Sequence, residues 1–280
     1  MQTRTTIAAR LLRISLTAAV LLGCLAAGSV NAALIFDRGL PTANINAAPP
    51  IRSNVDWSFG PSIFLGDDFT LASNPTGYVI DDIRVWIDGG TPGTGFQLGS
   101  LYSSLTLYGG PDGVGVGPLV TGSITGNTAT NNVTLTPVTY ADGSNYQGYT
   151  GTQYQIWQVD FGNLNWLVSA NTLMDFALGA TNPAGIDPND PNNYLYLLAS
   201  NAALSGSIQQ GADGLLRTFD SSSLAFNGTW NSAPTADGGW DKSSDINVQI
   251  FGHYVPEPGS LLLVGLALSG LALRGRKGAA

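Results

Sequence analysis

The chain has 280 residues, of which 44% are hydrophobic and only 11% are charged, and its formal net charge is −8. The hydrophobic fraction, with aromatic residues spread along the chain, argues against disorder. The negative charge disfavours nucleic acid and anionic lipid head groups as partners. One cysteine excludes a disulfide framework.

Residues 1–32 have the pattern of a secretory signal peptide. A positive start with three arginines precedes an apolar stretch over residues 14–25, and Val30-Asn31-Ala32 is a small-x-small cleavage sequence. We therefore expect export through the general secretion machinery and cleavage by signal peptidase between Ala32 and Ala33. This segment is excluded from the prediction of the fold.

The single cysteine, Cys24, lies inside this signal segment. Leu21-Leu22-Gly23-Cys24 faintly resembles a lipoprotein box, which leaves lipidation open as an alternative, although apolar residues continue past Cys24. Removal of the segment leaves a domain without thiol chemistry, and a domain of this size can bury enough core to fold without disulfides.

Residues 33–254 form the predicted ectodomain, and their composition favours strands. They include eighteen aspartates, no glutamate and only five cationic side chains, which gives a formal charge of −13. Residues with good helix propensity on exposed surfaces are therefore scarce. The cations are Arg38, Arg52, Arg84, Arg217 and Lys242.

Short runs with alternating apolar and polar residues, separated by Gly, Pro, Asn and Asp clusters, recur along this region. They predict nine strands in an all-β, single antiparallel β-sandwich that is jelly-roll-like. The Gly-rich stretch 109–126 has the composition of a linker, but strands resume directly after it, so we expect one domain. The runs cover residues 62–71, 77–88, 101–108, 133–140, 152–161, 173–180, 194–199, 215–219 and 246–254.

Catalytic chemistry has little support in the sequence. His253 is the only histidine, so a histidine-based triad or a nitrogen-rich metal site lacks partners, and we expect an exposed residue without a function. The pairs Asp67-Asp68 and Asp81-Asp82 are predicted to be solvated charges at strand edges. An Asp-dependent glycan hydrolase, which needs two carboxylates across about 5–10 Å, stays a weaker alternative, and the ectodomain is predicted not to be an enzyme.

Calcium is the one cofactor that the sequence suggests. Asp187 and Asp190, in the stretch Asp-Pro-Asn-Asp-Pro-Asn-Asn, offer closely spaced oxygen donors in a turn, and Asp237 and Asp241 offer a second pair. The same residues are also common turn formers. Calcium therefore stays a prediction for Asp187 and Asp190, and no other cofactor is expected.

Aromatic residues provide a candidate glycan site. Among the six tryptophans, Trp230 and Trp240 stand in Gly- and Asn-rich surroundings that predict exposed loops. Flat aromatic faces with a polar edge suit sugar stacking. A carbohydrate-binding module for the cell's own exopolysaccharide is therefore the second functional hypothesis.

Residues 255–280 have three parts in a fixed order. Val255-Pro256-Glu257-Pro258 is expected to be extended, because proline fixes φ and restricts the residue before it. An apolar run over 261–273 predicts a short membrane helix of about 20 Å against a hydrocarbon core of about 30 Å. Arg274, Arg276 and Lys277 then form a basic stop that favours the cytoplasmic side.

This order resembles the PEP-CTERM sorting signal of Gram-negative bacteria. The resemblance covers about a tenth of the chain, and Gly275 interrupts the basic cluster. It implies recognition and cleavage of the tail by a membrane-embedded exosortase. The protein would be anchored transiently in the inner membrane and then released to the cell surface or extracellular matrix.

Our leading hypothesis is therefore an exported, non-enzymatic surface or matrix protein. The resemblance implies an association with exopolysaccharide and biofilm.

Overall fold

The computed structural model describes residues 32–39, 54–57, 62–90, 92–93, 95–139, 146–147, 153–200, 216–230 and 245–255. Residues 32–253 form one compact unit; the other unit, residues 1–31 with 254–280, lies outside the described residues except for Tyr254 and Val255. The predicted signal peptide before Ala32 and the predicted membrane helix therefore stay predictions. No helix within the described ranges is long and apolar enough to cross a membrane.

Strands dominate the described residues, with two short 3₁₀ turns, η1 (Leu98–Ser100) and η2 (Pro191–Asn193). The strands are β1 (Ala33–Asp37), β2 (Asn54–Trp57), β3 (Ile63–Thr70), β4 (Tyr78–Asp88), β5 (Ser104–Pro111), β6 (Gly117–Thr125), β7 (Thr128–Ala129), β8 (Val133–Pro137), β9 (Tyr146–Gln147), β10 (Gln153–Tyr154), β11 (Ile156–Phe161), β12 (Trp166–Val168), β13 (Leu173–Thr181), β14 (Tyr196–Ser200), β15 (Leu216–Asp220), β16 (Phe226–Trp230), β17 (Asp245–Ile246) and β18 (Val248–Tyr254).

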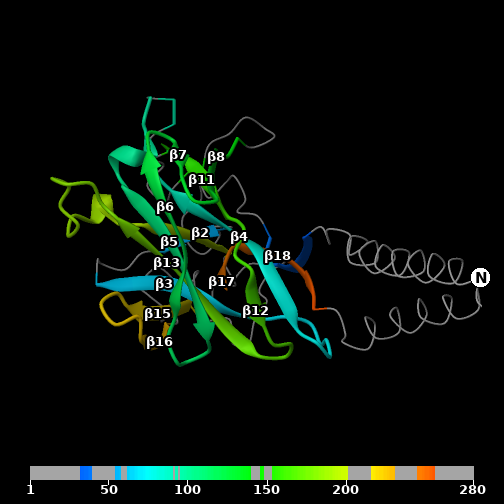
Figure 1. Ribbon diagram of the computed structural model, residues 1–280. Coiled ribbons are helices and arrows are strands. Elements are labelled where there is room, and N and C mark those ends of the chain that lie inside the picture. The colour runs from blue at the N-terminus through cyan, green and yellow to red at the C-terminus, as the bar shows by residue number, and fades with distance from the viewer. Residues whose placement is uncertain are drawn as a thin grey trace, which may run out of the picture. The chain divides into compact units, whose positions relative to one another are not determined.

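Two antiparallel sheets contain most of these strands (Figure 1). Within the described ranges, nine strands form the first sheet, with the path β1-β18-β4-β11-β8 and with β2, β12, β14 and β17 attached beside it. Seven strands form the second sheet, in the order β16-β15-β3-β13-β5-β6-β7. The prediction of an all-β fold with antiparallel sheets is confirmed.

The main core joins the two sheets. Ile83, Val85 and Val159 of the first sheet share one buried cluster with Phe69 and Phe176 of the second. Alternation explains this placement, because successive side chains of a strand point to opposite faces and each of these residues lies on the inner face. Burial of such side chains stabilises the fold by about 1.5–3 kcal/mol each.

A smaller hydrophobic cluster lies apart from this core. Trp86, Ile156 and Leu198 come from the adjacent strands β4, β11 and β14 and are buried together. The sequence places Trp86 and Ile156 opposite the core residues of their own strands. Their burial shows that this region of the first sheet is also covered, so both faces of β4 are apolar at its end.

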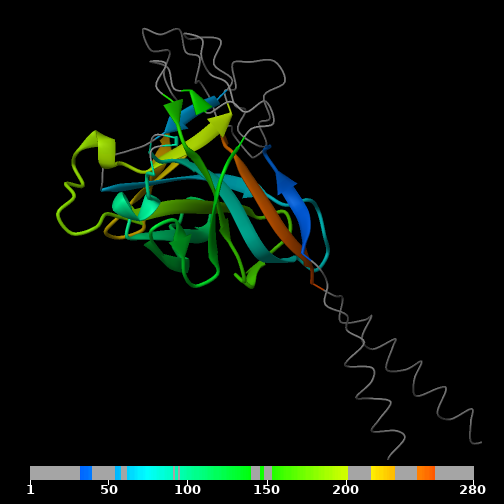
Figure 2. The ribbon, with the colours of Figure 1, turned by 90° about the horizontal axis from the view of Figure 1, so that it is seen from above.

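The first and last strands of the described unit are neighbours (Figures 1 and 2). β1 pairs antiparallel with β18, so that Ala33 lies opposite Gly252 and Leu34 lies opposite Phe251. The predicted signal-peptidase site, between Ala32 and Ala33, therefore falls where the first strand begins. Ala33, the first residue of β1, therefore lies one strand spacing from β18, close to the end of that strand.

Candidate functional site

The end of β18 is the part of the described structure closest in sequence to the predicted sorting motif. β18 ends at Tyr254, and Val255 follows without a linker. Pro256, Glu257 and Pro258 lie outside the described residues, as do Arg274, Arg276 and Lys277. The site can therefore be built from the folded side of this junction.

His253 lies at this end of β18 and is not the isolated residue that the sequence suggests. Its Nδ1 atom is 2.7 Å from Oδ2 of Asp81 on β4, and both side chains are about a quarter exposed. The prediction of a plainly exposed histidine is therefore wrong, and the absence of a catalytic role stays a prediction. The pair ties the last strand to its neighbour close to the junction.

A row of polar contacts continues this tie along the same strands. Arg84 of β4 makes an ion pair with Asp160 of β11 at 2.5 Å and donates to Gln249 of β18 at 3.2 Å. Gln249 in turn donates to Asp37 of β1 at 3.2 Å, and the Arg84 guanidinium lies over the ring of Phe251. Side chains thus connect four neighbouring strands.

The Asp82 side chain, beside this row, has a strongly shifted pKa. Burial, followed by repulsion from Asp160, raises its pKa to about 6, although Arg84 acts in the opposite direction. Asp81 and Asp82 are therefore partly buried residues inside β4, and the prediction that they are solvated strand-edge charges is wrong. Their environment is set by neighbours on β11 and β18.

Asp67 and Asp68 depart further from the prediction, because both are buried in β3. Arg38 lies 2.8 Å from Asp67 and 3.5 Å from Asp68, and its Nε atom is 3.6 Å from Asp245. Burial raises the pKa of Asp67 well above its ordinary value, with Arg38 opposing the change. These aspartates are parts of a buried ionic network.

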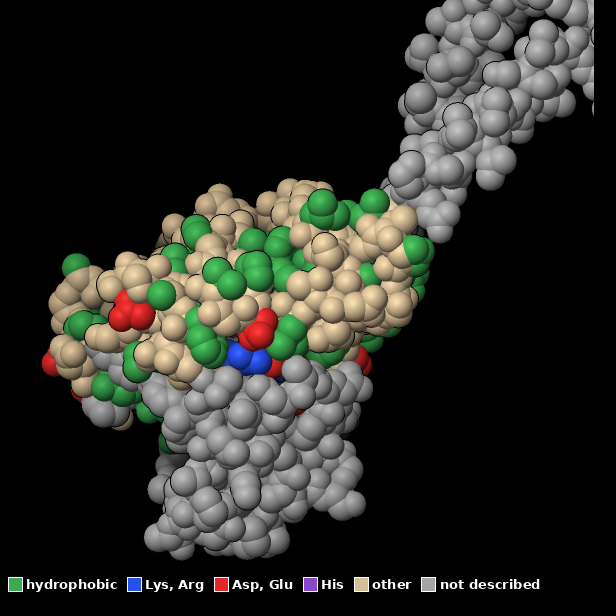
Figure 3. Space-filling model, turned by 90° about the horizontal axis from the view of Figure 1, so that it is seen from below, with side chains coloured by type: hydrophobic (Ala, Val, Ile, Leu, Met, Phe, Trp, Pro, Cys, Tyr) green, Lys and Arg blue, Asp and Glu red, His purple; other side chains and the backbone are tan. Residues whose placement is uncertain are grey.

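Arg217 extends the network from β15. It contacts Asp68 at 2.5 Å and Asp112 at 2.7 Å, and Asp175 of β13 lies 3.9 Å away. Burial raises the pKa of Asp175 to about 6, against the effect of Arg217. On the face drawn in Figure 3, the blue surface of Lys and Arg lies beside the red of Asp and Glu.

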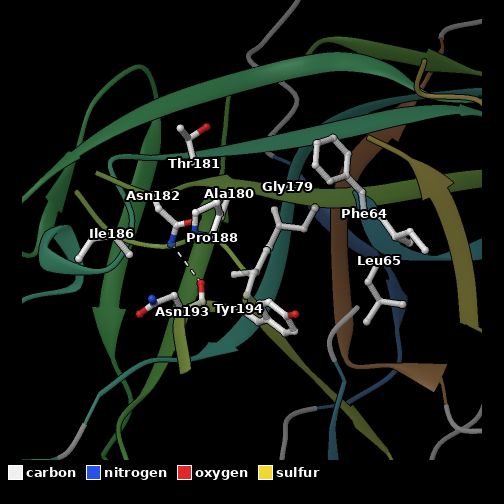
Figure 4. A pocket seen from close by; sticks show the side chains of 13 residues that line it. Phe64, Leu65, Gly179, Ala180, Thr181, Asn182, Ile186, Pro188, Asn193 and Tyr194 are labelled. Atoms are coloured by element: carbon white, nitrogen blue, oxygen red, sulfur yellow. Dashed lines mark hydrogen bonds between the residues drawn. The ribbon is translucent and has the colours of Figure 1, made fainter. Parts of the chain in front are cut away.

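A pocket of about 300 Å³ opens at the start of β3 and the end of β13, under the loop that precedes β14 (Figure 4). Phe64 lines one side, and Gly179 lies close to its ring, where a β-carbon would come within 2.8 Å. Asn182, Asn193 and Tyr194 provide polar groups around it. Its lining contains no charged residue, and so offers no pair of carboxylates of the kind that a glycan hydrolase needs.

The predicted calcium residues shape the rim of this pocket. Oδ1 of Asp187 accepts hydrogen bonds from both the backbone and the side-chain amide of Asn189, and Asp190 binds Asn192 in the same way. These contacts are those of Asx turns. Within the described ranges, no group of three or more His, Cys, Asp or Glu side chains could hold a metal, and calcium binding stays a prediction.

Hydrogen bonds hold this loop to the sheets. The Asn182 side chain donates to the carbonyls of Leu101 and Asn193, at 3.0 and 3.1 Å, and the Tyr102 hydroxyl donates to the carbonyl of Tyr194 at 2.6 Å. Asn193 donates to the carbonyl of Asp187 at 2.8 Å. The pocket is therefore pre-formed. No sequence signal marked it, because its walls come from segments more than 100 residues apart.

Of the two predicted glycan tryptophans, the structure describes the backbone of one. Trp230 is the last residue of β16, where its backbone lies opposite Leu216, and so it belongs to a strand and not to a loop. Trp240 lies outside the described residues.

Comparison with known protein families gives one match. Residues 255–277 match the family described as the PEP-CTERM protein-sorting motif. No curated protein and no solved structure is significantly similar to the chain. The match begins at the residue that follows β18 and includes the motif and the basic stop. The chain therefore carries the PEP-CTERM protein-sorting motif at residues 255–277, and this motif implies an exosortase as its processing partner.

Proposed function

We propose that this protein is a non-enzymatic surface or extracellular-matrix component, which an exosortase cuts within the tail and which is associated with exopolysaccharide and biofilm. The observation that carries the proposal is the sorting motif at residues 255–277, which implies export and an exosortase as processing partner. The ectodomain would be delivered as a jelly-roll-like sandwich covering residues 33–254, between a signal peptide and a single-helix tail.

Replacement of one residue in the motif tests the processing step. Glu257→Gln keeps the apolar run and should leave uncleaved protein in the inner membrane, whereas wild-type protein should reach the medium or the cell surface. Replacement of Arg274, Arg276 and Lys277 by Ser should weaken retention before cleavage. Intact-mass measurement of the released wild-type protein decides: a mass that still includes residues 261–277 would show that the tail is only an anchor.

Glycan binding is the second candidate, and the pocket favours it. A cavity of about 300 Å³, at the lower end of the range for small-molecule sites, combines the Phe64 and Tyr194 rings with amide and hydroxyl groups. An uncharged lining in a domain with an excess of aspartates suits a neutral saccharide unit better than an ionic ligand.

Titration of the released protein with the extracellular polysaccharide of its own host tests this candidate. Tyr194→Ala should reduce binding at least five-fold, while Leu167→Ala, on an exposed side chain outside the pocket lining, should not. Equal binding by both variants would remove the pocket from the proposal.

A further inference from the structure

No residue separates the last strand, β18, from the sorting motif. β18 ends at Tyr254 and the family match starts at Val255. Up to Gly252, backbone positions of β18 pair with β1. A processing enzyme therefore meets a folded strand immediately before its recognition sequence.

The end of β18 is also held from its other side. At Gly252 a β-carbon would lie 2.3 Å from the carbonyl oxygen of Val79 on β4, so the two backbones approach too closely for any side chain. One residue further on, His253 is joined to Asp81 of β4 at 2.7 Å. Both neighbours thus fix the strand within three residues of the motif.

This arrangement restricts how an exosortase can bind its substrate. Enzymes that hold a peptide in extended form commonly do so through main-chain hydrogen bonds. In β18, main-chain groups already bond to neighbouring strands, and a second partner has no room while the ladder is intact. The enzyme therefore cannot add main-chain hydrogen bonds to β18 while the folded sheet stays intact.

We propose that the folded end of β18, held by the His253–Asp81 pair, limits the access of the exosortase to the tail. His253 is a positioning residue: it acts on processing through the strand and not through contact with the scissile bond. Local opening of the last residues of β18 precedes cleavage, and the cut falls C-terminal to Val255. This inference rests on the proposed processing of the tail.

An inserted spacer tests the steric limit without changing the sequence that the exosortase recognises. Four residues, Gly-Ser-Gly-Ser, are inserted between Tyr254 and Val255 of the full-length chain, and processing is followed by pulse-chase in cells that contain the exosortase. We expect the rate to rise at least three-fold. The same spacer inserted after Gly113, in a turn with open space around it, is the matched control and should leave the rate unchanged.

Substitutions at the pair test the role of His253. His253→Ala should raise the processing rate, and this increase should disappear in the chain that already carries the spacer before Val255. Thr106→Ala removes a side-chain hydrogen bond between β5 and β6 of the other sheet and should not change the rate. Intact masses of the released protein should show one cut site in the wild type, C-terminal to Val255.

The outcomes distinguish this inference from the function on which it rests. An unchanged rate with the spacer before Val255, or a cut N-terminal to Val255, would overturn the steric limit but leave sorting intact. A rate that rises equally with the spacer after Gly113 would also overturn it. If wild type and both spacer variants all remain uncleaved, the sorting proposal itself fails. An unchanged rate for His253→Ala, with a spacer effect present, would remove the positioning role of His253.

Discussion

At the scale of single residues, the largest departure from expectation concerns charge. The sequence shows few cations among many aspartates, which predicts a solvated acidic surface. In the structure, however, Arg38 and Arg217 are buried among Asp67, Asp68 and Asp175. Alternation along a strand cannot reveal this, because the partners come from segments up to about 150 positions apart.

Removal of Arg38 should be far more costly than removal of Arg84. A buried charge that loses its partner is left uncompensated, and breaking such a pair typically costs about 3–5 kcal/mol. Arg38→Met should therefore lower the free energy of unfolding by about that amount. Arg84→Met removes a partly exposed pair and should cost about 1 kcal/mol or less.

Urea unfolding of the released protein measures both values on one scale. Replacement of Asp67 by Asn, combined with Arg38→Met, should recover part of the loss, because the carboxylate closest to Arg38 is then replaced by a neutral amide. Equal costs for Arg38→Met and Arg84→Met would contradict the central position of Arg38.

At the scale of elements, the sequence predicts strands well where apolar residues alternate. All nine predicted strands occur, and the alternating residues Trp157, Val159 and Phe161 of β11 are buried in one cluster. β6 was not among them, because its Gly, Ser and Thr residues have the composition of a linker. It nonetheless forms an antiparallel ladder with β5, with one irregularity between Leu107 and Tyr108. Whether such a segment becomes a strand depends on its pairing with a neighbouring strand, and its own sequence does not reveal that pairing.

The loop before β14 tests the calcium prediction. We expect millimolar calcium to raise the melting temperature, because a ligand that binds only the native state stabilises it. Joint replacement of Asp187 and Asp190 by Asn should abolish this increase, since it removes charge. Without calcium the variant should melt like the wild type, because an Asn side chain can form the same turn.

Thermal melts in calcium and in chelator provide the comparison. Replacement of Asp220, an exposed aspartate that binds Ser222 and Ser223, by Asn is the control and should leave the calcium response intact. Identical melting of the wild type in both solutions would show that the two aspartates are turn formers only.

At the scale of the whole molecule, buried carboxylates determine how stability depends on pH. Burial raises the pKa values of Asp82 and Asp175 to about 6, above the value of about 4 in an unfolded chain. Between these pH values the folded state holds more protons than the unfolded state. Stability should therefore fall as pH rises from about 4 to 6.

Unfolding measurements at pH 4.5 and pH 7.5 test the sign. The contribution of Asp175, which is fully buried, amounts to at most about 3 kcal/mol for a shift of about two pKa units. Asp175→Asn should remove this part of the difference. Asp190→Asn, at the loop surface, should not change it. Higher stability of the wild type at pH 7.5 than at pH 4.5 would contradict the expected direction.

The pairing of β1 with β18 also has a consequence for the order of events during export. Ala33 lies opposite Gly252, so in the export that we propose, with the N-terminus first, the first strand of the unit waits for the last. Contacts that join such distant parts of a chain form late, because closure of a long loop costs entropy first. The sheet can be completed only when β18 has crossed, and the sorting motif emerges directly behind it. The fold is thus completed immediately before the tail reaches its enzyme.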